Sequence, residues 1–399
     1  MNTFGPIISI RRVAGGVVVA LGWLIHGLAA DPAMAAGPIV ISGNEAKIDL
    51  TSGAGRRIVP EGPDSLTILD FGTFPPKVTH VMDVPNTVIG PPSNIAITPD
   101  GALALVANSL RMDPEDSTNW FPETFVHVVD LASQPPRVMG RVETGRQPSG
   151  ISITGDGRVA LVANRASGTI SVLRVRGANV ESVGEVLVCD PADSLSDVAV
   201  SPDGRRVLAS VQKGGYLALL DLDGERLTLT GRQFSVYGQP YRVVITPDGA
   251  LGLTAGAGTG NGLDRDALSV VDLEADPIRT TDFVPLGSVP ESIEVSPNGR
   301  LVAAVLMEGS NLAETHRDHS KEGRLVILER RGRTYRLASE HAIGRIPEGV
   351  AFTGDGRHLV VQCHPDRELR IFSVRGSRVR DTGKRVAVPG FPSSLRASP

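Results

Sequence analysis

A pattern that recurs six times along this chain constrains its fold more than any other feature. Each copy has two short apolar runs separated by Ser or Thr, Pro or Gly, Asp or Asn, and then Gly. The last residue of this motif recurs every 45 to 57 residues, at Gly101, Gly157, Gly204, Gly249, Gly299 and Gly356. Repeats of this length with strand-like alternation are typical of the four-stranded blades of a β-propeller.

The second copy shows how one repeat divides into four strands. Isoleucines alternate along a first strand at residues 151–153, and Gly-Asp-Gly at 155–157 forms a tight hairpin. Residues 158–164 then form a second strand, 169–175 a third one rich in β-branched residues, and 180–188 a fourth. No segment has a convincing 3.6-residue periodicity, so an α/β fold with crossover helices is excluded.

The two ends of the chain supply the parts of a seventh repeat. Residues 392–399 form an opening strand without its continuation, whereas 39–42, 65–71 and 77–84 form three later strands without an opening one. Joined together, they complete a blade and leave no open sheet edge. We therefore predict an all-β fold: a seven-bladed β-propeller with four-stranded blades, in which strands from both termini close the last blade.

The first 35 residues have the composition of a signal peptide. The basic pair Arg11-Arg12 precedes an apolar run over 13–30, and Ala-Met-Ala at 33–35 matches the pattern that a signal peptidase cuts. The alternative is a membrane anchor, which the Asp-Pro pair directly after the apolar run disfavours. We expect residues 1–35 to be a signal peptide and 36–399 a single propeller domain. The protein would then be periplasmic or secreted, with no stable membrane span after cleavage and with the Sec and twin-arginine export routes both open.

Charge and composition exclude several classes of partner and cofactor. The chain has 40 basic and 44 acidic residues, and this mildly acidic balance argues against a nucleic-acid partner. Neither a haem-attachment motif nor a nucleotide-binding motif is present, so the cofactor is unknown, with a divalent metal left open. The two cysteines, Cys189 and Cys363, fall on well-separated blades, so we expect two buried thiols rather than a disulfide.

Two of the copies carry a more specific signal. Leu-Val-Ala-Asn at residues 105–108 and again at 161–164 follows shortly after Asp-Gly, which resembles the YVTN repeat of bacterial exported propellers. The resemblance covers essentially the whole chain after residue 35 and implies an exported propeller. This group is also similar to lactonase-type propellers, so the resemblance implies a lactonase-like hydrolase as one function to consider.

Polar residues of the inner strands are the first candidates for a site, because these strands line the central channel. The residues that we expect to bind a ligand are Asn94, Asp197, Tyr241, Arg242, Glu291 and Arg396, and those that we expect to supply acid–base chemistry are Glu294 and Glu348. Asp197 and Arg242 hold equivalent positions on neighbouring blades, where they can form an ion pair. Glu294 and Arg396 stand where the other inner strands have small or apolar residues.

A charge at such a position must be paired, solvated by channel water or functional, and two interpretations stay open. In the first, the charges are structural ion pairs or the wet lining of a scaffold. In the second, Arg242 or Arg396 anchors an anionic ligand, and Glu291, Glu294 or Glu348 transfers protons.

Three long loops between the second and third strands of their blades form a second candidate region. They span residues 109–123, 256–266 and 308–322, and each is longer than a hairpin requires. The last loop contains His316, Asp318 and His319, which have the ligand types of a metal site. The alternative is a solvated polar loop.

Two functions follow from these features. The first is a binding or accessory propeller that offers its loop face and channel to a periplasmic protein or a small anionic ligand. The second is a lactonase-like hydrolase in which channel arginines and glutamates orient the substrate while a water or loop-bound metal attacks it. Convergence of Arg242, Glu294 and Arg396 on one solvent pocket would favour the hydrolase, whereas mutual pairing would favour a scaffold.

Overall fold

The computed structural model describes residues 37–51, 55–58, 62–113, 115–116, 119–256 and 264–399. The strands within these ranges belong to one compact unit, Ala36–Pro399. No helix in these described ranges is both long and apolar enough to cross a membrane. The predicted signal peptide at 1–35 and most of the loop at 256–266 lie outside the described residues.

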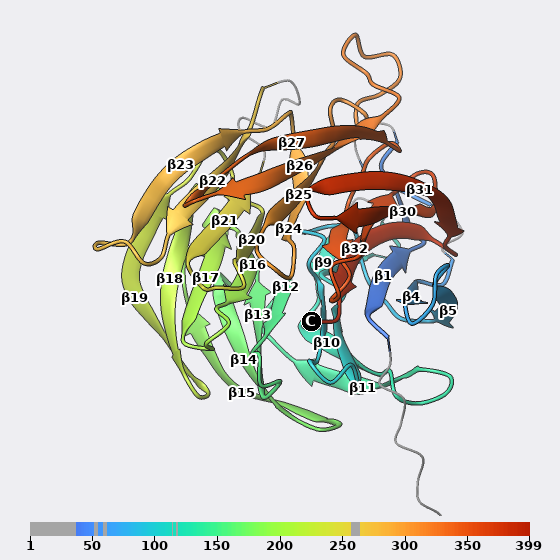
Figure 1. Ribbon diagram of the computed structural model, residues 1–399. Helices are drawn as coiled ribbons and strands as arrows, with labels where there is room; N and C mark the ends of the chain where they lie inside the picture. Colours follow the sequence, from blue (N-terminus) through green and yellow to red (C-terminus); the bar gives the residue numbers. More distant parts are fainter. Residues whose placement is uncertain (1–36, 52–54, 59–61, 114, 117–118, 257–263) are drawn as a thin grey trace, which may run out of the picture. The chain divides into compact units, whose positions relative to one another are not determined.

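Seven antiparallel sheets of four strands form the blades of a propeller (Figure 1). From the innermost strand outward, the first three blades are β6 (Ile95–Ile97), β7 (Leu103–Ala107), β10 (Phe125–Asp130) and β11 (Arg137–Glu143); β12 (Pro148–Ile153), β13 (Val159–Asn164), β14 (Thr169–Arg176) and β15 (Asn179–Leu187); and β16 (Leu195–Val200), β17 (Arg206–Val211), β18 (Tyr216–Asp223) and β19 (Arg226–Ser235). Blades 4 to 6 are β20 (Arg242–Ile245), β21 (Leu251–Ala255), β22 (Ala267–Asp272) and β23 (Arg279–Pro285); β24 (Pro290–Val295), β25 (Leu301–Leu306), β26 (Gly323–Arg331) and β27 (Thr334–Ile343); and β28 (Val350–Phe352), β29 (His358–Cys363), β30 (Glu368–Arg375) and β31 (Arg378–Ala387). Blade 7 is β32 (Phe391–Ala397), β1 (Ile39–Glu45), β4 (Ser65–Asp70) and β5 (Lys77–Met82).

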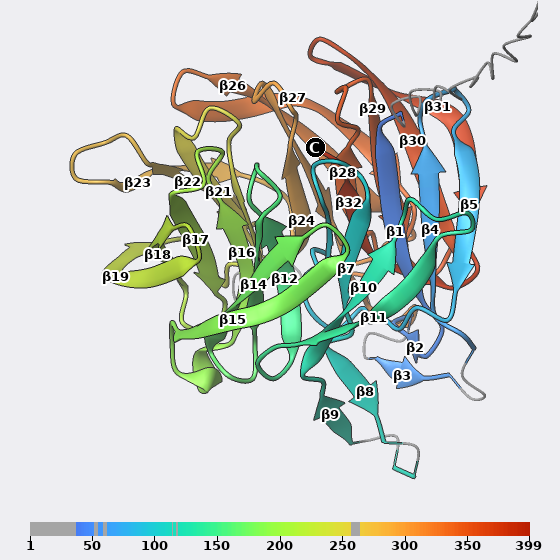
Figure 2. The same ribbon diagram turned by 90° about the horizontal axis from the view of Figure 1, so that it is seen from below.

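Three short elements among the described residues lie outside the blades. They are the hairpin of β2 (Ile48–Asp49) and β3 (Arg56–Arg57), the hairpin of β8 (Leu110–Met112) and β9 (Trp120–Pro122), and a 3₁₀ turn at Pro191–Asp193. Figure 2 shows both hairpins on the same side of the ring, where the Arg57 guanidinium donates to the Asp113 carbonyl at 3.2 Å.

Both chain ends contribute to blade 7, which closes the ring. The inner strand β32 pairs with β1 in antiparallel register, with Leu395 opposite Ser42. Each inner strand then packs against the inner strands of the next and the previous blade, from β6 through β32 and back to β6. The predicted seven-bladed propeller with a last blade shared by both termini is therefore confirmed.

The repeated motif folds as a hairpin between the first two strands of a blade. In blade 2 the Thr154 hydroxyl donates to Asp156 Oδ1 at 2.6 Å, and the same oxygen accepts the Arg158 N–H at 3.0 Å. Gly157 follows with φ of 72°, a left-handed conformation that favours glycine. Blade 5 keeps these bonds with Asn298 in place of Asp, because only the side-chain oxygen is required.

The core of the propeller lies between neighbouring blades. The second strand of blade 2, β13, is buried on both faces, and Leu161 packs in one cluster with Val198 and Ala209 of blade 3. Burial on both faces explains why these strands read as continuous apolar runs. Each fully buried Leu or Ile contributes about 1.5–3 kcal/mol, so the blades hold the inner strands firmly around the channel.

Candidate functional site

The channel has two mouths, which differ in the segments that surround them. The inner strands begin at what we call the upper mouth, on the side of the loops that join second and third strands. They end at what we call the lower mouth, where the repeated Ser/Thr-to-Gly hairpins gather. The candidate residues of the inner strands lie in successive layers between these mouths.

Arg242 lies at the centre of an ion-pair network inside the channel. Its Nη2 donates to Glu294 Oε2 at 2.5 Å, and its Nε donates to the Ile293 carbonyl at 2.7 Å. Its Nη1 lies 3.7 Å from Asp197 Oδ2, so the pair predicted from the sequence does form. The side chains of Arg242 and Asp197 are only 2% and 1% exposed, which makes this the most deeply buried pair of charges in the network.

Hydrogen bonds hold the Asp197 carboxylate on its other sides. Its Oδ1 accepts from the Ser93 hydroxyl at 2.9 Å, and its Oδ2 accepts from the Val243 N–H at 3.0 Å. Burial raises the pKa of Asp197, while Arg242 and Arg396 act in the opposite direction. The carboxylate thus depends on cations and donors from blades 1, 4 and 7 to stay ionised.

Arg396 extends the network to the wall of the lower mouth. Its Nη1 lies 3.5 Å from Glu294 Oε2, and its Nη2 donates to the Ile151 carbonyl at 3.0 Å. Burial lowers the pKa of Arg396 to about 10, with Arg242 acting in the same direction and Glu294 opposing it. Two arginines and two carboxylates therefore balance one another across the channel.

Glu294 and Arg396 differ from the other two members because they also face a cavity. Their side chains are 16% and 20% exposed, and both line a hollow of about 430 Å³ at the lower mouth. Every blade except the third contributes to its wall, through Pro99, Ser152, Pro247, Pro297, Phe352 and Ala397 among others. A mainly apolar wall with two charged groups at one place is typical of a small-molecule site.

At the upper mouth, three consecutive blades place ionisable side chains at equivalent positions. Tyr241, Glu291 and Glu348 lie at or just before the start of the inner strands of blades 4, 5 and 6, where the other blades have serine. Glu348 is buried, whereas Tyr241 and Glu291 keep partial solvent access although protein surrounds them. Arg165 of blade 2 lies near Tyr241 and donates to the Ser196 hydroxyl at 3.2 Å.

The two glutamates at the upper mouth hold their protons unusually tightly. Burial raises the pKa of Glu291 to about 8. Burial also raises the pKa of Glu348 well above its usual range, and the neighbouring carboxyls of Glu291 and Glu45 add to this effect. Both carboxyls therefore stay protonated near neutral pH, and Glu291 ionises only near pH 8. Burial and Glu291 likewise raise the pKa of Tyr241, which bonds to the Gly90 backbone.

The remaining sequence-predicted residues lie apart from these two groups. The Asn94 amide is buried and donates to the Thr87 carbonyl at 3.0 Å, so it anchors the segment that leads from β5 to β6. In the 308–322 loop, Asp318 accepts from Arg317 at 3.0 Å and lies 3.7 Å from His316, whereas His319 Nδ1 contacts the Leu312 carbonyl at 2.9 Å. Each of the three side chains thus has a partner, but their ligand atoms do not converge on one point. The metal site at this loop stays a prediction.

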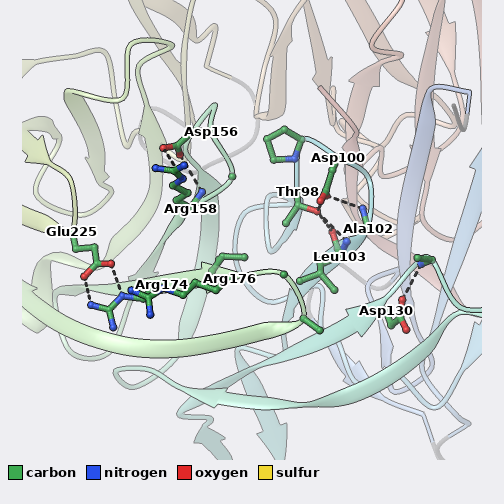
Figure 3. A pocket seen from close by; sticks show the side chains of 16 residues that line it. Thr98, Asp100, Ala102, Leu103, Asp130, Asp156, Arg158, Arg174, Arg176 and Glu225 are labelled. Carbon is green, nitrogen blue, oxygen red and sulfur yellow. Dashed lines mark hydrogen bonds and ion pairs between the residues drawn. The ribbon is translucent and has the colours of Figure 1, made fainter. Parts of the chain in front are cut away.

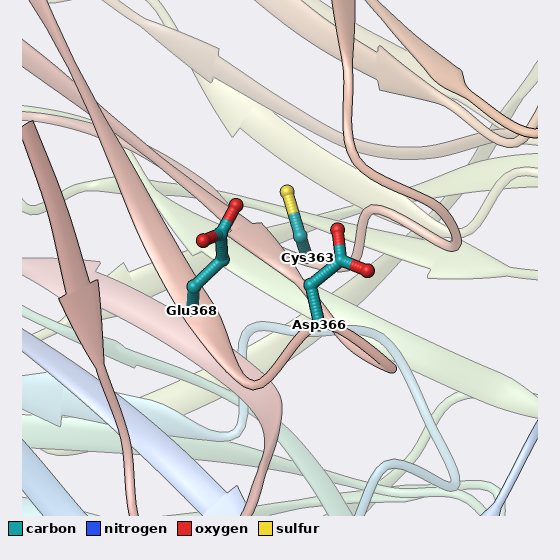
Figure 4. Close-up of side chains that lie close together, drawn as sticks. All are labelled: Cys363, Asp366 and Glu368. Atoms are coloured by element: carbon teal, nitrogen blue, oxygen red, sulfur yellow. The ribbon is translucent and has the colours of Figure 1, made fainter. Parts of the chain in front are cut away.

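Cys363 forms a different cluster of ligand types with Asp366 and Glu368, shown in Figure 4. Both carboxylates already pair with Arg370, at 3.5 Å and 2.7 Å. Burial raises the pKa of the Cys363 thiol to about 12, so the thiolate that a metal requires is disfavoured. Cys189 and Cys363 are both buried and unpaired, as the sequence predicted.

A larger hollow of about 780 Å³ lies on the lower side of blades 1 to 3 (Figure 3). Several of its charged residues already have partners. The Asp100 carboxylate accepts from Thr98 and from the Ala102 N–H, and Arg174 pairs with both Glu225 and Glu181. Asp100, Arg174 and Glu225 are therefore already engaged within the protein.

Three residues near the upper mouth of the channel were not predicted from the sequence. Arg165, Glu45 and Gly90 reach the upper layer from a second strand, from the N-terminal strand and from the β5–β6 connection. None lies in the part of the repeat that identified the other candidates. The Ser/Thr-Pro dipeptides of blades 1, 4 and 5 carried a signal for the lower-mouth cavity, because their prolines line it.

Comparisons with known proteins show the fold but no family. No protein-family model matches the sequence, and no curated protein does. A Bacteroides fragilis protein to which 6-phosphogluconolactonase activity has been ascribed aligns with a TM-score of 0.66 and 15% identity, over 92% of this chain and 99% of that one. A functionally unknown protein from Desulfotomaculum acetoxidans aligns with a TM-score of 0.65 and 14% identity, over 90% and 98%. The periplasmic gluconolactonase of Pseudomonas aeruginosa aligns with a TM-score of 0.61 and 18% identity, over 90% and 99%.

At these identities the similarity is one of fold alone. Membership of the YVTN-repeat group stays a prediction from the sequence.

Proposed function

We propose that this protein is an exported binding propeller that holds a small ligand in the lower-mouth cavity. One observation carries the proposal: Glu294 and Arg396 belong to a charge-balanced network, yet both keep solvent access and line the same cavity. Arg242 and Asp197 form the buried support that orients them. Export rests on the signal-peptide pattern of residues 1–35.

The cavity wall indicates the class of ligand. Arg396 has N–H groups beyond those bonded to Glu294 and Ile151, and these can donate to a carboxylate or an ester carbonyl. The Glu294 carboxylate can accept a hydrogen bond from a hydroxyl group of the ligand. Phe352 and the prolines of the wall can contact its C–H groups. A hydroxy acid or its cyclic ester fits this combination. The names of two structural neighbours make sugar lactones and sugar acids the first compounds to test.

Arg396→Gln should weaken the binding of gluconate or glucono-lactone about tenfold or more, because the substitution removes a charged fork of donors. Isothermal titration calorimetry of the chain from Ala36 onward measures the change. Arg385→Gln is the matched control, since Arg385 pairs with Asp381 on the outer strand of blade 6 and should leave affinity unchanged. Equal affinity of Arg396→Gln and the native protein would contradict this site.

Lactone hydrolysis is the second candidate function, and the glutamate pair at the upper mouth favours it. Glu291 and Glu348 lie at equivalent positions of adjacent blades, and their raised pKa values keep both carboxyls protonated near neutral pH, so that either can donate a proton. Glu291 ionises near pH 8 and can then accept one. The proposal does not require a metal, although the His316–His319 loop would supply ligands if one takes part.

Under this second function, Glu348→Gln should lower the rate of lactone opening about 100-fold, whereas Glu314→Gln in an exposed loop should not. A pH-stat assay against a lactone panel, with and without prior chelation, reports the rate. No turnover by the native protein would remove hydrolysis and leave the binding role. Loss of turnover on chelation would place a metal, with His316 and His319, in the reaction.

A further inference from the structure

The outer hairpins of the seven blades share one structural position that allows a comparison within the chain. It is the residue pair at the turn, where the third strand ends and the fourth begins. In chain order the pairs are Asp70–Lys77, Asp130–Arg137, Arg176–Asn179, Asp223–Arg226, Asp272–Arg279, Arg331–Thr334 and Arg375–Arg378. Four pairs join opposite charges, and only the pair of blade 6 joins like charges. Like charges directly opposite one another destabilise a sheet, so this exception calls for a reason.

A third arginine reinforces the exception. The register places Arg380 opposite Ser373, two residues beyond the Arg375–Arg378 pair on each strand. Since side chains alternate along a strand, these four side chains lie on one face of the β30–β31 hairpin. All three arginines are exposed, and none of them has an ion-pair partner in the described part of the structure.

These arginines line a groove of about 760 Å³ between β27 and the β30–β31 hairpin. Its lining contains the hydroxyls of Ser339, Ser373 and Ser377 and no carboxylate. Glu329, the acid that contacts Ser377, already accepts from Arg300 and Arg331. The groove is thus strongly basic and has no internal counter-charge at its surface.

Blade 2 shows the same hairpin with its charges balanced. Its four equivalent positions hold Arg174, Arg176, Asn179 and Glu181. Arg174 pairs with Glu181 at 2.7 Å and also with Glu225, as Figure 3 shows for the latter. The propeller therefore accommodates a neutralised hairpin at this position, and the fold itself does not require three unpaired arginines.

We propose that the blade 6 groove is a binding site for a small anion with two or more phosphate or carboxylate groups. Guanidinium groups match the planar oxygen pairs of such anions and bind them through paired N–H donors. Arg375, Arg378 and Arg380 present three such groups within one hairpin, so a multivalent anion contacts more than one at a time. The site is separate from the channel and independent of the function proposed for it.

The test uses two probes of matched charge class, inorganic pyrophosphate and citrate, titrated into the chain from Ala36 onward at about 50 mM NaCl. The variant Arg378→Asn/Arg380→Glu gives the fourth strand of blade 6 the two residues that blade 2 has at these positions, Asn179 and Glu181. Ser373 stays where blade 2 has Arg174, and the new carboxylate lies on the same face as Arg375. We expect at least one probe to bind saturably, with affinity lost about 20-fold or more in the variant and falling as salt rises. Comparison of the two probes shows whether phosphate or carboxylate is preferred.

Arg176→Ala in blade 2 is the matched control and should leave affinity unchanged, because that hairpin contains its own carboxylate. The thermal midpoint of the double variant should equal or exceed that of the native protein, since the substitutions remove like-charge repulsion. The proposal is overturned if neither probe binds saturably, if the folded double variant binds as tightly, or if only a long polyanion such as dextran sulfate binds.

Discussion

Replacing Arg242 by methionine should lower the free energy of unfolding by about 3–5 kcal/mol at neutral pH, the largest loss that we expect from a single channel substitution. The methionine fills similar space but leaves the buried Asp197 carboxylate without the cation 3.7 Å away. It also removes the 2.5 Å bond to Glu294 and the donor to the Ile293 carbonyl. Urea unfolding followed by fluorescence or circular dichroism measures the change.

The loss should depend on pH in a defined direction. Without Arg242, the pKa of Asp197 in the folded protein rises further above the value of about 3.9 that an unfolded chain has. The folded state then binds a proton that the unfolded state has released, so the variant loses stability as pH rises through this window. The deficit should be smaller near pH 5 than near pH 8.

A second substitution separates lost pairing from lost packing. Asp197→Asn removes the buried charge and keeps one oxygen that can accept from the Val243 N–H, while its NH2 group can donate to the Ser93 hydroxyl oxygen. The double variant Asp197→Asn/Arg242→Met should therefore recover part of the loss. Arg174→Met is the control, because Arg174 pairs with two glutamates at the solvent-accessible surface and should cost much less. A similar loss in both arginine variants would show that burial of the pair does not decide its contribution.

Glu291→Gln should raise the free energy of unfolding at about pH 9 by roughly 2–3 kcal/mol while changing little near or below pH 4. Burial raises the pKa of this carboxyl in the folded protein to about 8, above its unfolded value of about 4.3. Between these values the folded state retains a proton that the unfolded state releases, so native stability falls as pH rises. Glutamine stays neutral and removes that dependence, and water in the channel keeps the gain below the full value of the shift.

Urea unfolding at several pH values tests this expectation. Glu314→Gln serves as the control, because Glu314 is 77% exposed and should shift the curve equally at all pH values, if at all. The native and Glu291→Gln curves should converge below about pH 4 and separate progressively between about pH 4.3 and pH 8. Parallel curves over the whole range would mean that Glu291 ionises in the folded protein as it does in the unfolded chain.

Much of the fold was predictable because the repeat encodes each blade locally. Apolar alternation and the Ser/Thr-to-Gly hairpin identify the first two strands of six blades, and the hairpin bonds of Thr154, Asp156 and Gly157 depend only on neighbouring residues. Closure of blade 7 was predictable for a different reason. Each terminal fragment lacks the strands of a blade that the other fragment supplies, and a sheet edge left unpaired between them would be unfavourable.

The candidate site was predictable only in part. The two-residue period of the inner strands identified the side chains that face the channel, including Glu294 and Arg396. It did not reveal that their cavity opens at the lower mouth, opposite the long loops that the sequence favoured. The 256–266 loop lies largely outside the described residues, and its part in the second candidate region stays a prediction.

The sequence by itself determined the number of blades, the strand order and the residues that face the channel, because each depends on local periodicity or on pairing between adjacent segments. Only the tertiary structure decided which charges meet. Arg242 bonds to residues 51 and 52 positions away, and Arg396 bonds to the carbonyl of a residue 245 positions away. Such contacts depend on ring closure and on the reach of each side chain across the channel, and no local pattern records either one.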